Sequence, residues 1–184
     1  MKTALLLIDI QEGLDEPGFY GEERNNLHAE ENCEKALKLF RLKKWPIFHI
    51  KHNSTNPDSP LFLGKSGNNI KDLVAPHNGE VLYEKSVNSA FIGTPLELSL
   101  KAEGVERVVI VGLTLEHCIS TSVRMAANLG FKTILLADAT AAFDKQGANG
   151  AHFSAQLVFD VTIANLKDEF AEIMTTAQLS AALD

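Results

Sequence analysis

The chain has 184 residues, which at about 150 residues per domain predicts a single domain over residues 1–184. Hydrophobic residues make up 45% and charged residues 22%, a balance that excludes disordered and fibrous classes, and a net charge of −7 argues against nucleic acid as a partner. Two cysteines cannot form a disulfide framework, and no apolar run approaches the length of about 20 residues that spans a bilayer, so we expect a cytoplasmic protein without a membrane partner.

The first predicted elements are a strand and a helix. Residues 3–8 form an uninterrupted apolar run, as expected of a strand buried on both faces. Asn25 or Asn26 can cap a helix that runs to about Lys44. The apolar stripe of this helix is predicted to contain Leu27, Cys33, Ala36, Leu37 and Phe40.

The rest of the chain alternates apolar runs with helical patterns. Further strands are predicted at 46–50, 80–83, 107–111, 132–137 and 171–174. Further helices are predicted at 94–103, 118–129 and 149–166, with a short last helix after 175. Thr94 with Glu97, and Thr175 with Gln178, have the spacing of capping boxes. The polar segment 53–69, with its prolines and glycines, is predicted to be a surface loop.

Strands separated by helices predict a particular architecture. The connections must cross over the sheet, so we expect an α/β fold of three layers, α/β/α, with a mainly parallel six-stranded sheet. In such sheets ligands bind beyond the carboxyl ends of the strands. The residues that directly follow the strands are therefore the first candidates for chemistry.

Three reactive residues stand at these positions. Asp9 follows the first strand, Lys85 follows the third, and Cys118 begins the helix after the fourth. A carboxylate, an ammonium and a thiol form a complete set for nucleophilic acyl transfer. A helix N-terminus and a lysine both favour a thiolate, so we expect Cys118 to be thiolate-rich at neutral pH although Asp9 opposes this. Cys33, on an apolar helix face, is expected to be neutral and shielded.

The segments around these residues resemble the isochorismatase-like cysteine hydrolase superfamily over nearly the whole chain. The resemblance rests on residues 4–11, 84–91, 111–118 and 121–131. It implies a Rossmann-like isochorismatase-like hydrolase fold with the strand order 3-2-1-4-5-6, assembled as a homodimer or higher homo-oligomer. It also implies a triad in which Asp9 is the general base and acid, Lys85 the electrostatic partner and Cys118 the nucleophile.

The same resemblance implies an oxyanion hole. The family places a non-proline cis peptide bond shortly before the cysteine, and this bond maps to Leu113–Thr114. Its expected use is to direct the N–H of Thr114, together with that of Cys118, at the developing oxyanion.

Four residues are candidates for substrate contact, and three of them have a second interpretation. His117 and Glu116 flank the nucleophile, and Glu116 near a helix start could instead complement the helix dipole. Gln11 could bind substrate or orient Asp9. Phe91 could form a wall of the site or belong to the ordinary core.

A metal site is not expected. The nicotinamidase branch of the superfamily holds a metal through an Asp-x-His pair after the second strand, whereas this chain reads Ile50-Lys51-His52. His49 and His52 also fall on opposite faces of an extended chain. We therefore expect neither a metal nor another cofactor, and His52 has no assigned role.

Together these features predict a metal-independent cysteine hydrolase that cleaves a small amide- or ureide-type C–N bond through a thioester, with a small molecule as its partner. Two alternatives remain open. The isochorismatases proper have no cysteine at this position, so turnover that does not need Cys118 would favour a vinyl-ether hydrolase acting on an isochorismate-like acid. An inert Cys118 would favour a non-catalytic interaction module that keeps the fold.

Overall fold

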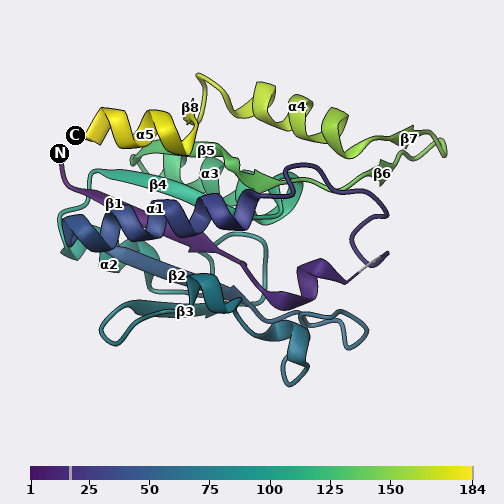
Figure 1. Cartoon of the computed structure of the whole chain (residues 1–184), viewed down its shortest axis with the longest axis horizontal. Coiled ribbons are helices and arrows are strands. Elements are labelled where there is room, and N and C mark those ends of the chain that lie inside the picture. The colour runs from purple at the N-terminus through teal and green to yellow at the C-terminus, as the bar shows by residue number, and fades with distance from the viewer. Residues whose placement is uncertain (17, 184) are drawn as a thin grey trace.

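A six-stranded sheet forms the centre of the structure, a computed structural model that describes residues 1–16 and 18–183 (Figure 1). The strands are β1 (Thr3–Ile8), β2 (Ile47–His52), β3 (Val81–Lys85), β4 (Arg107–Leu113), β5 (Lys132–Ala141) and β8 (Glu172–Met174). Their spatial order is β3-β2-β1-β4-β5-β8, and each neighbouring pair is parallel. This order confirms the predicted 3-2-1-4-5-6, with β8 as the sixth strand of the sheet.

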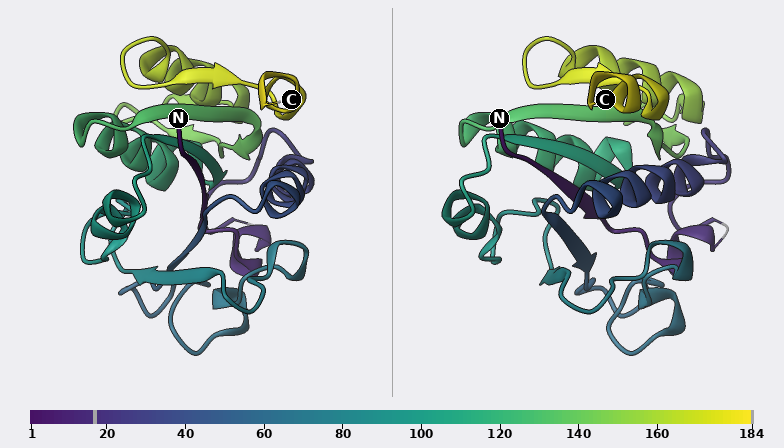
Figure 2. Two further views of the ribbon diagram at one scale, coloured as in Figure 1. Left: turned by 90° about the vertical axis from the view of Figure 1, so that its left-hand side faces the viewer. Right: turned by 60° about the vertical axis from the view of Figure 1, so that its left-hand side comes forward.

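Helices cover both faces of the sheet and complete the three predicted layers (Figure 2). They are α1 (Ala29–Lys43), α2 (Leu96–Ala102), α3 (Ser120–Asn128), α4 (Ala155–Leu166) and α5 (Thr176–Leu183). The core between the sheet and α1 also receives a side chain from α5, whereas α2, α3 and α4 contribute to the core on the opposite face. Within the described ranges, no helix is long and apolar enough to cross a membrane.

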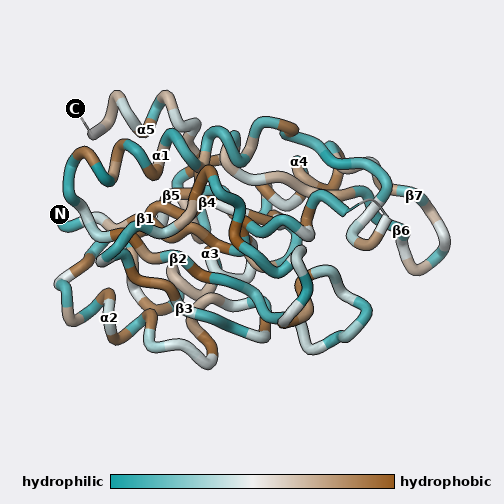
Figure 3. The backbone as a smooth tube through the Cα atoms, turned by 60° about the horizontal axis from the view of Figure 1, so that its bottom comes forward, coloured by the Kyte–Doolittle hydropathy of each residue, from teal (hydrophilic) through white to brown (hydrophobic). Residues whose placement is uncertain are grey.

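The central strand β1 contributes side chains to both cores, which explains why it is apolar from Ala4 to Ile8. Leu5 and Leu7 pack on the face covered by α1, and Leu6 and Ile8 pack on the other face. All six residues of the strand are buried, and the central strands appear as hydrophobic segments inside the fold (Figure 3). Each fully buried leucine contributes about 1.5–3 kcal/mol to stability, so β1 is a rigid element on which to place a site.

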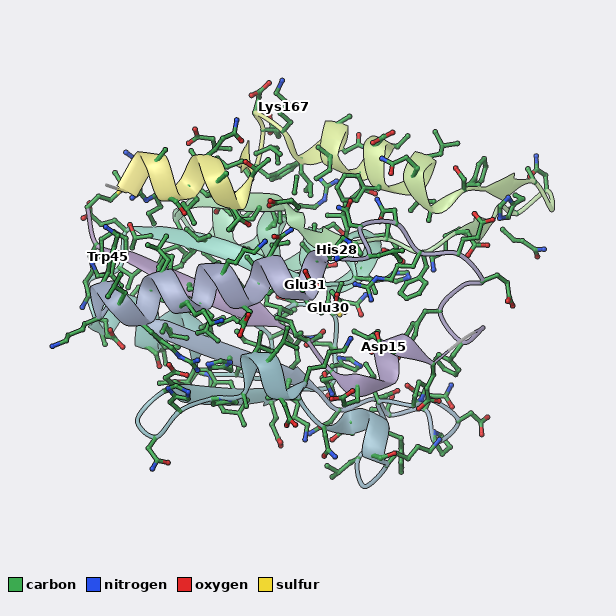
Figure 4. All side chains as sticks on the ribbon, viewed as in Figure 1. Asp15, His28, Glu30, Glu31, Trp45 and Lys167 are labelled. Atoms are coloured by element: carbon green, nitrogen blue, oxygen red, sulfur yellow. The ribbon has the colours of Figure 1, made fainter. Side chains whose placement is uncertain are left out.

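The predicted start of the first helix is wrong. The helix α1 begins after His28 (Figure 4), three residues later than an Asn25 cap would allow, and Leu27 is 75% exposed. Asn25 accepts a hydrogen bond from the backbone N–H of residue 142, and Asn26 donates to the carbonyls of residues 137 and 140. Both asparagines therefore fix the loop before α1 to the end of β5 instead of capping the helix.

The other helix starts differ in how well they follow the sequence pattern. Thr175 and Gln178 form the predicted capping box, with bonds of 2.7 and 3.2 Å. Glu97 instead forms an ion pair with Lys101, so α2 has no capping box. A hairpin of β6 (Lys145–Gln146) and β7 (His152–Phe153) replaces the first residues of the long helix predicted at 149–166. Gly150, with φ of 80°, lies in the turn of this hairpin, and α4 begins only after Ser154.

Candidate active site

The carboxyl ends of three strands bring the three predicted catalytic residues together. Asp9 follows β1 in the left-handed backbone region, with φ of 55°, and its N–H bonds to the carbonyl of Ile50 in β2. Lys85 is the last residue of β3. Cys118 lies in a single π-helical turn, Leu115–Ile119, between β4 and α3. Left-handed aspartates and π turns are both frequent at functional sites.

A glycine at the end of β4 allows this convergence. Gly112 pairs with Ile8 in the sheet, and its φ of 125° is a conformation that side chains rarely adopt. A Cβ atom at this position would collide with the backbone of Ile8. Only glycine therefore lets β4 pass so close to β1 just before Asp9.

The Lys85 ammonium links the other two members of the triad. Its Nζ lies 2.6 Å from Asp9 Oδ2 and 3.3 Å from Cys118 Sγ. The residues are nearly buried, with 2%, 4% and 9% of Asp9, Lys85 and Cys118 exposed. The second carboxylate oxygen, Oδ1 of Asp9, is buried and has no hydrogen-bond partner in the described structure, so it is free to accept a proton.

The predicted thiolate at rest is wrong. Burial raises the pKa of the Cys118 thiol, the Asp9 carboxylate raises it further, and the opposing effect of Lys85 does not outweigh the two. Cys118 is therefore a neutral thiol at pH 7. A helix start and a nearby lysine can be seen in the sequence, whereas the burial that dominates depends on the fold. Cys33 follows its prediction, because complete burial raises the pKa of its thiol and excludes solvent.

A fourth residue, His52, belongs to this cluster and was given no role from the sequence. It pairs with Lys85 in the register of β2 and β3, and its Nδ1 lies 3.1 Å from Lys85 Nζ. Burial lowers the pKa of His52, and the Lys85 ammonium lowers it further. The ring is therefore neutral, with Nδ1 accepting a hydrogen bond from the ammonium.

The cluster does not fit a metal ion. One ligand atom each of Asp9, His52 and Cys118 lies within 4.8 Å of the others, the spacing of a three-ligand site. However, the Lys85 ammonium contacts all three residues and already supplies the positive charge between them. His49 cannot add a ligand, because it is directed away from this cluster and bonds to Glu80 at 2.9 Å.

The triad opens into a cavity of about 380 Å³, a volume suited to a small molecule. The residues that line this cavity are Asp9, Leu14, Phe19, Tyr20, His52, Ser54, Asn56, Ser59, Leu61, Asn88, Leu113, Thr114, His117 and Cys118. Thr114 follows the expected cis peptide bond, since Leu113–Thr114 is cis. His117 also lies in the wall, as a residue that contacts substrate would.

Gln11 and Phe91 do not line the cavity, contrary to the expectation of substrate contact. The Gln11 side chain is buried, accepts a bond from the N–H of His52 at 2.8 Å, and donates to the carbonyls of His52 and Asn68. It therefore holds the backbone at the end of β2. Phe91 stacks on Phe131 within the core on the α2–α3 face. Its second interpretation, ordinary core, describes it correctly.

Glu116 also has a structural partner. It forms an ion pair with Lys145 at 3.2 Å and accepts a bond from the N–H of Phe143 at 3.3 Å. It does not belong to the cavity wall. Glu116 therefore ties the turn that carries Cys118 to the chain just after β5.

Tyr20 and Asn88 are among the several wall residues that the sequence pattern did not mark as candidates. The Tyr20 hydroxyl lies 3.4 Å from the Ser59 hydroxyl, and Asn88 Oδ1 lies 3.8 Å from Cys118 Sγ. Asn88 falls inside segment 84–91, which carries part of the family resemblance, so the resemblance could have marked it as a candidate site residue. Tyr20 lies in an irregular segment whose path cannot be inferred from periodicity.

Comparisons with known proteins agree on one family. A family model described as Isochorismatase domain matches residues 3–178. The chain is 46% identical to the uncharacterized isochorismatase family protein YrdC of Bacillus subtilis (strain 168), over 97% of this chain and 94% of that protein. It is 39% identical to the N-carbamoylsarcosine amidase of Arthrobacter sp, over 73% of this chain and 57% of that protein. The crystal structure of an isochorismatase-family protein from Chromobacterium violaceum ATCC 12472 matches with a TM-score of 0.94 and 39% identity, over 99% of this chain and 93% of that one.

Proposed function

Because this chain belongs to the isochorismatase family and is a hydrolase, we propose that it cleaves the C–N bond of a small amide or ureide, with Cys118 as nucleophile and without a metal ion. One observation carries the proposal. The Lys85 ammonium contacts both the Asp9 carboxylate and the Cys118 sulfur in a buried cluster that opens into a cavity. The amidase among the relatives supports the choice of a C–N bond.

The first step is activation of the thiol. Because Cys118 is neutral at rest, it needs a base, and the Asp9 carboxylate shares the buried cluster with the sulfur. Asp9 takes the thiol proton as the sulfur attacks the substrate carbonyl carbon. Lys85 remains beside both groups and stabilises whichever of them carries the negative charge.

The next steps transfer the acyl group. The N–H groups of Thr114 and Cys118 hold the oxyanion of the tetrahedral intermediate. Asp9 then gives its proton to the departing nitrogen, so that the C–N bond breaks and an amine or ammonia leaves. The acyl group remains on Cys118 as a thioester. Asp9 next removes a proton from water, which attacks the thioester. The C–S bond then breaks, the acid leaves, and Asp9 returns the proton to the Cys118 sulfur.

A panel of small amides and ureides, assayed for released ammonia or amine, tests this function. We expect the wild-type protein to hydrolyse at least one class, and we expect Cys118→Ala and Asp9→Asn to lose turnover by at least about a hundredfold, as general-base and nucleophile losses usually do. Cys33→Ala is the matched control, since that cysteine lies in the core away from the cavity. Turnover that survives Cys118→Ala would contradict the proposal and favour chemistry of the vinyl-ether type.

A further inference from the structure

The cavity wall has an uneven charge composition. Of the wall residues in the described part of the chain, Asp9 is the only one with a carboxyl group, and none is lysine or arginine. His52 and His117 are the remaining titratable bases in the wall, and burial lowers the pKa of both. The wall thus presents one carboxylate and a set of uncharged groups to a substrate.

Two lysines lie close behind the wall, and the ammonium of each already forms an ion pair with a carboxylate of the protein. The side chain of Lys85 is fully buried, and its ammonium contacts Asp9, His52 and Cys118. Lys145 contacts the carbonyl of Tyr20 at 2.6 Å and forms an ion pair with Glu116 at 3.2 Å. Neither lysine is among the residues that line the cavity.

The uncharged side chains of the wall are of two kinds, hydrogen-bonding and apolar. Ser54, Ser59, Asn56 and Asn88 offer hydroxyl and amide groups that can donate and accept hydrogen bonds. The rest of the wall includes aromatic and aliphatic side chains, among them Phe19, Tyr20 and Leu61. An uncharged polar group can exchange its water contacts for these partners. A carboxylate would lose hydration without gaining a cation in the wall.

We infer that this site selects small amides or ureides whose remaining part carries no negative charge, and that it rejects the corresponding carboxylic acids. This inference rests on the proposed function and deepens it by naming the substrate class. It places the selection in the wall of the cavity, outside the triad. A cation added to the wall should therefore relax the selection.

The electrostatic preference can be measured on Cys118 without knowing the substrate. Iodoacetamide and iodoacetate are similar in size and alkylate the same sulfur, but iodoacetate carries a carboxylate at pH 7. The rate constant for Cys118 is determined with each reagent by peptide mass mapping. The ratio of the two rate constants is then divided by the same ratio for the protein unfolded in urea, which removes the intrinsic difference between the reagents.

We expect the normalised ratio to favour iodoacetamide by at least about tenfold, which corresponds to about 1.4 kcal/mol. In Asn56→Arg, which places a guanidinium on an exposed wall residue, the ratio should fall several-fold, whereas the matched control Asn56→Gln should keep it high. The same direction is expected in turnover, with succinamide hydrolysed in preference to succinamate. These two amides are nearly equal in size and differ by one charge.

The outcomes separate the two proposals. A normalised ratio near one, or one that favours iodoacetate, would overturn the selection for uncharged substrates while leaving Cys118 as the nucleophile. A ratio that Asn56→Arg and Asn56→Gln change equally would overturn its origin in the charge of the wall. No labelling of Cys118 by either reagent would overturn the proposed function itself, and the selection with it.

Discussion

Replacing Lys85 with methionine removes the ammonium that contacts Asp9 and Cys118 but keeps an unbranched side chain in the same buried place. The distance of 3.3 Å between Lys85 Nζ and Cys118 Sγ sets the size of the effect. At an effective dielectric constant of about 20, a positive charge at this distance stabilises a thiolate by about 5 kcal/mol. Its loss raises the pKa of the thiol and lowers the fraction of thiolate by about 3.7 orders of magnitude.

The expected change in reactivity is smaller than the change in the fraction of thiolate. A thiolate of higher pKa is a better nucleophile, and this recovers about half of the logarithmic loss. We therefore expect Lys85→Met to slow alkylation of Cys118 by iodoacetamide at pH 7 by about tenfold to a hundredfold.

The assay compares Lys85→Met with a second buried lysine. Lys71 is 7% exposed and forms ion pairs with Glu30 and Asp15, outside the cavity that contains Cys118. Lys71→Met therefore reports the cost of losing a buried lysine but should leave the labelling of Cys118 unchanged. Circular dichroism shows whether both variants are folded. If folded Lys85→Met is labelled as fast as the wild type, the reasoning is refuted, because the ammonium would then not stabilise the Cys118 thiolate.

Three further outcomes are expected. Brief iodoacetamide treatment of the folded wild type should label Cys118 first and leave fully buried Cys33 almost unlabelled; equal labelling would mean that Cys118 only packs. Turnover should survive exhaustive chelation, and loss of activity that zinc or iron restores would contradict the metal-free mechanism. Burial alone would raise the pKa of Glu80, but hydrogen bonds from Arg41, the N–H of residue 77 and His49 outweigh it and lower that pKa from 4.5 to about 2. The stability from these bonds is thus fully present above pH 4.5 and is lost as the pH falls toward 2. In urea unfolding, Glu80→Gln should therefore lower the free energy of unfolding by about 2 kcal/mol at pH 7 and by less at pH 3. An equal loss at both pH values would contradict this.

The strands and the positions of the triad residues after them could be predicted because their signals are local. A short apolar run indicates a buried strand whatever the rest of the chain contains. Such runs stand before Asp9 and, rich in valine and isoleucine, at 107–111. Parallel strands place their carboxyl ends at one edge, so the residues that follow them must meet. The family resemblance supplied the strand order and the cis peptide bond, which periodicity does not encode.

Other features depend on contacts between distant residues and could not be predicted. The contact of His52 with Lys85 follows from the register of β2 against β3, and the sequence does not specify a register. Asn25 and Asn26 resemble helix caps locally, but bonds to residues 137–142, more than a hundred positions away, determine their conformation. The neutral state of Cys118 has the same origin, because its burial results from the packing of several elements.

The presence of an acyl group on Cys118 tests the central claim most directly. Wild-type protein is mixed with an amide that it hydrolyses, quenched in acid within the first turnovers, digested and mapped by mass spectrometry. The account predicts that the Cys118 peptide gains the mass of the acyl part of the substrate, that hydroxylamine removes this mass, and that the Cys33 peptide stays unmodified. Under conditions in which Cys118→Ala is inactive, replacement of Asp9 by asparagine should abolish the adduct. Full turnover with no adduct on Cys118 at any quench time, together with undiminished activity of Cys118→Ala, would contradict the account.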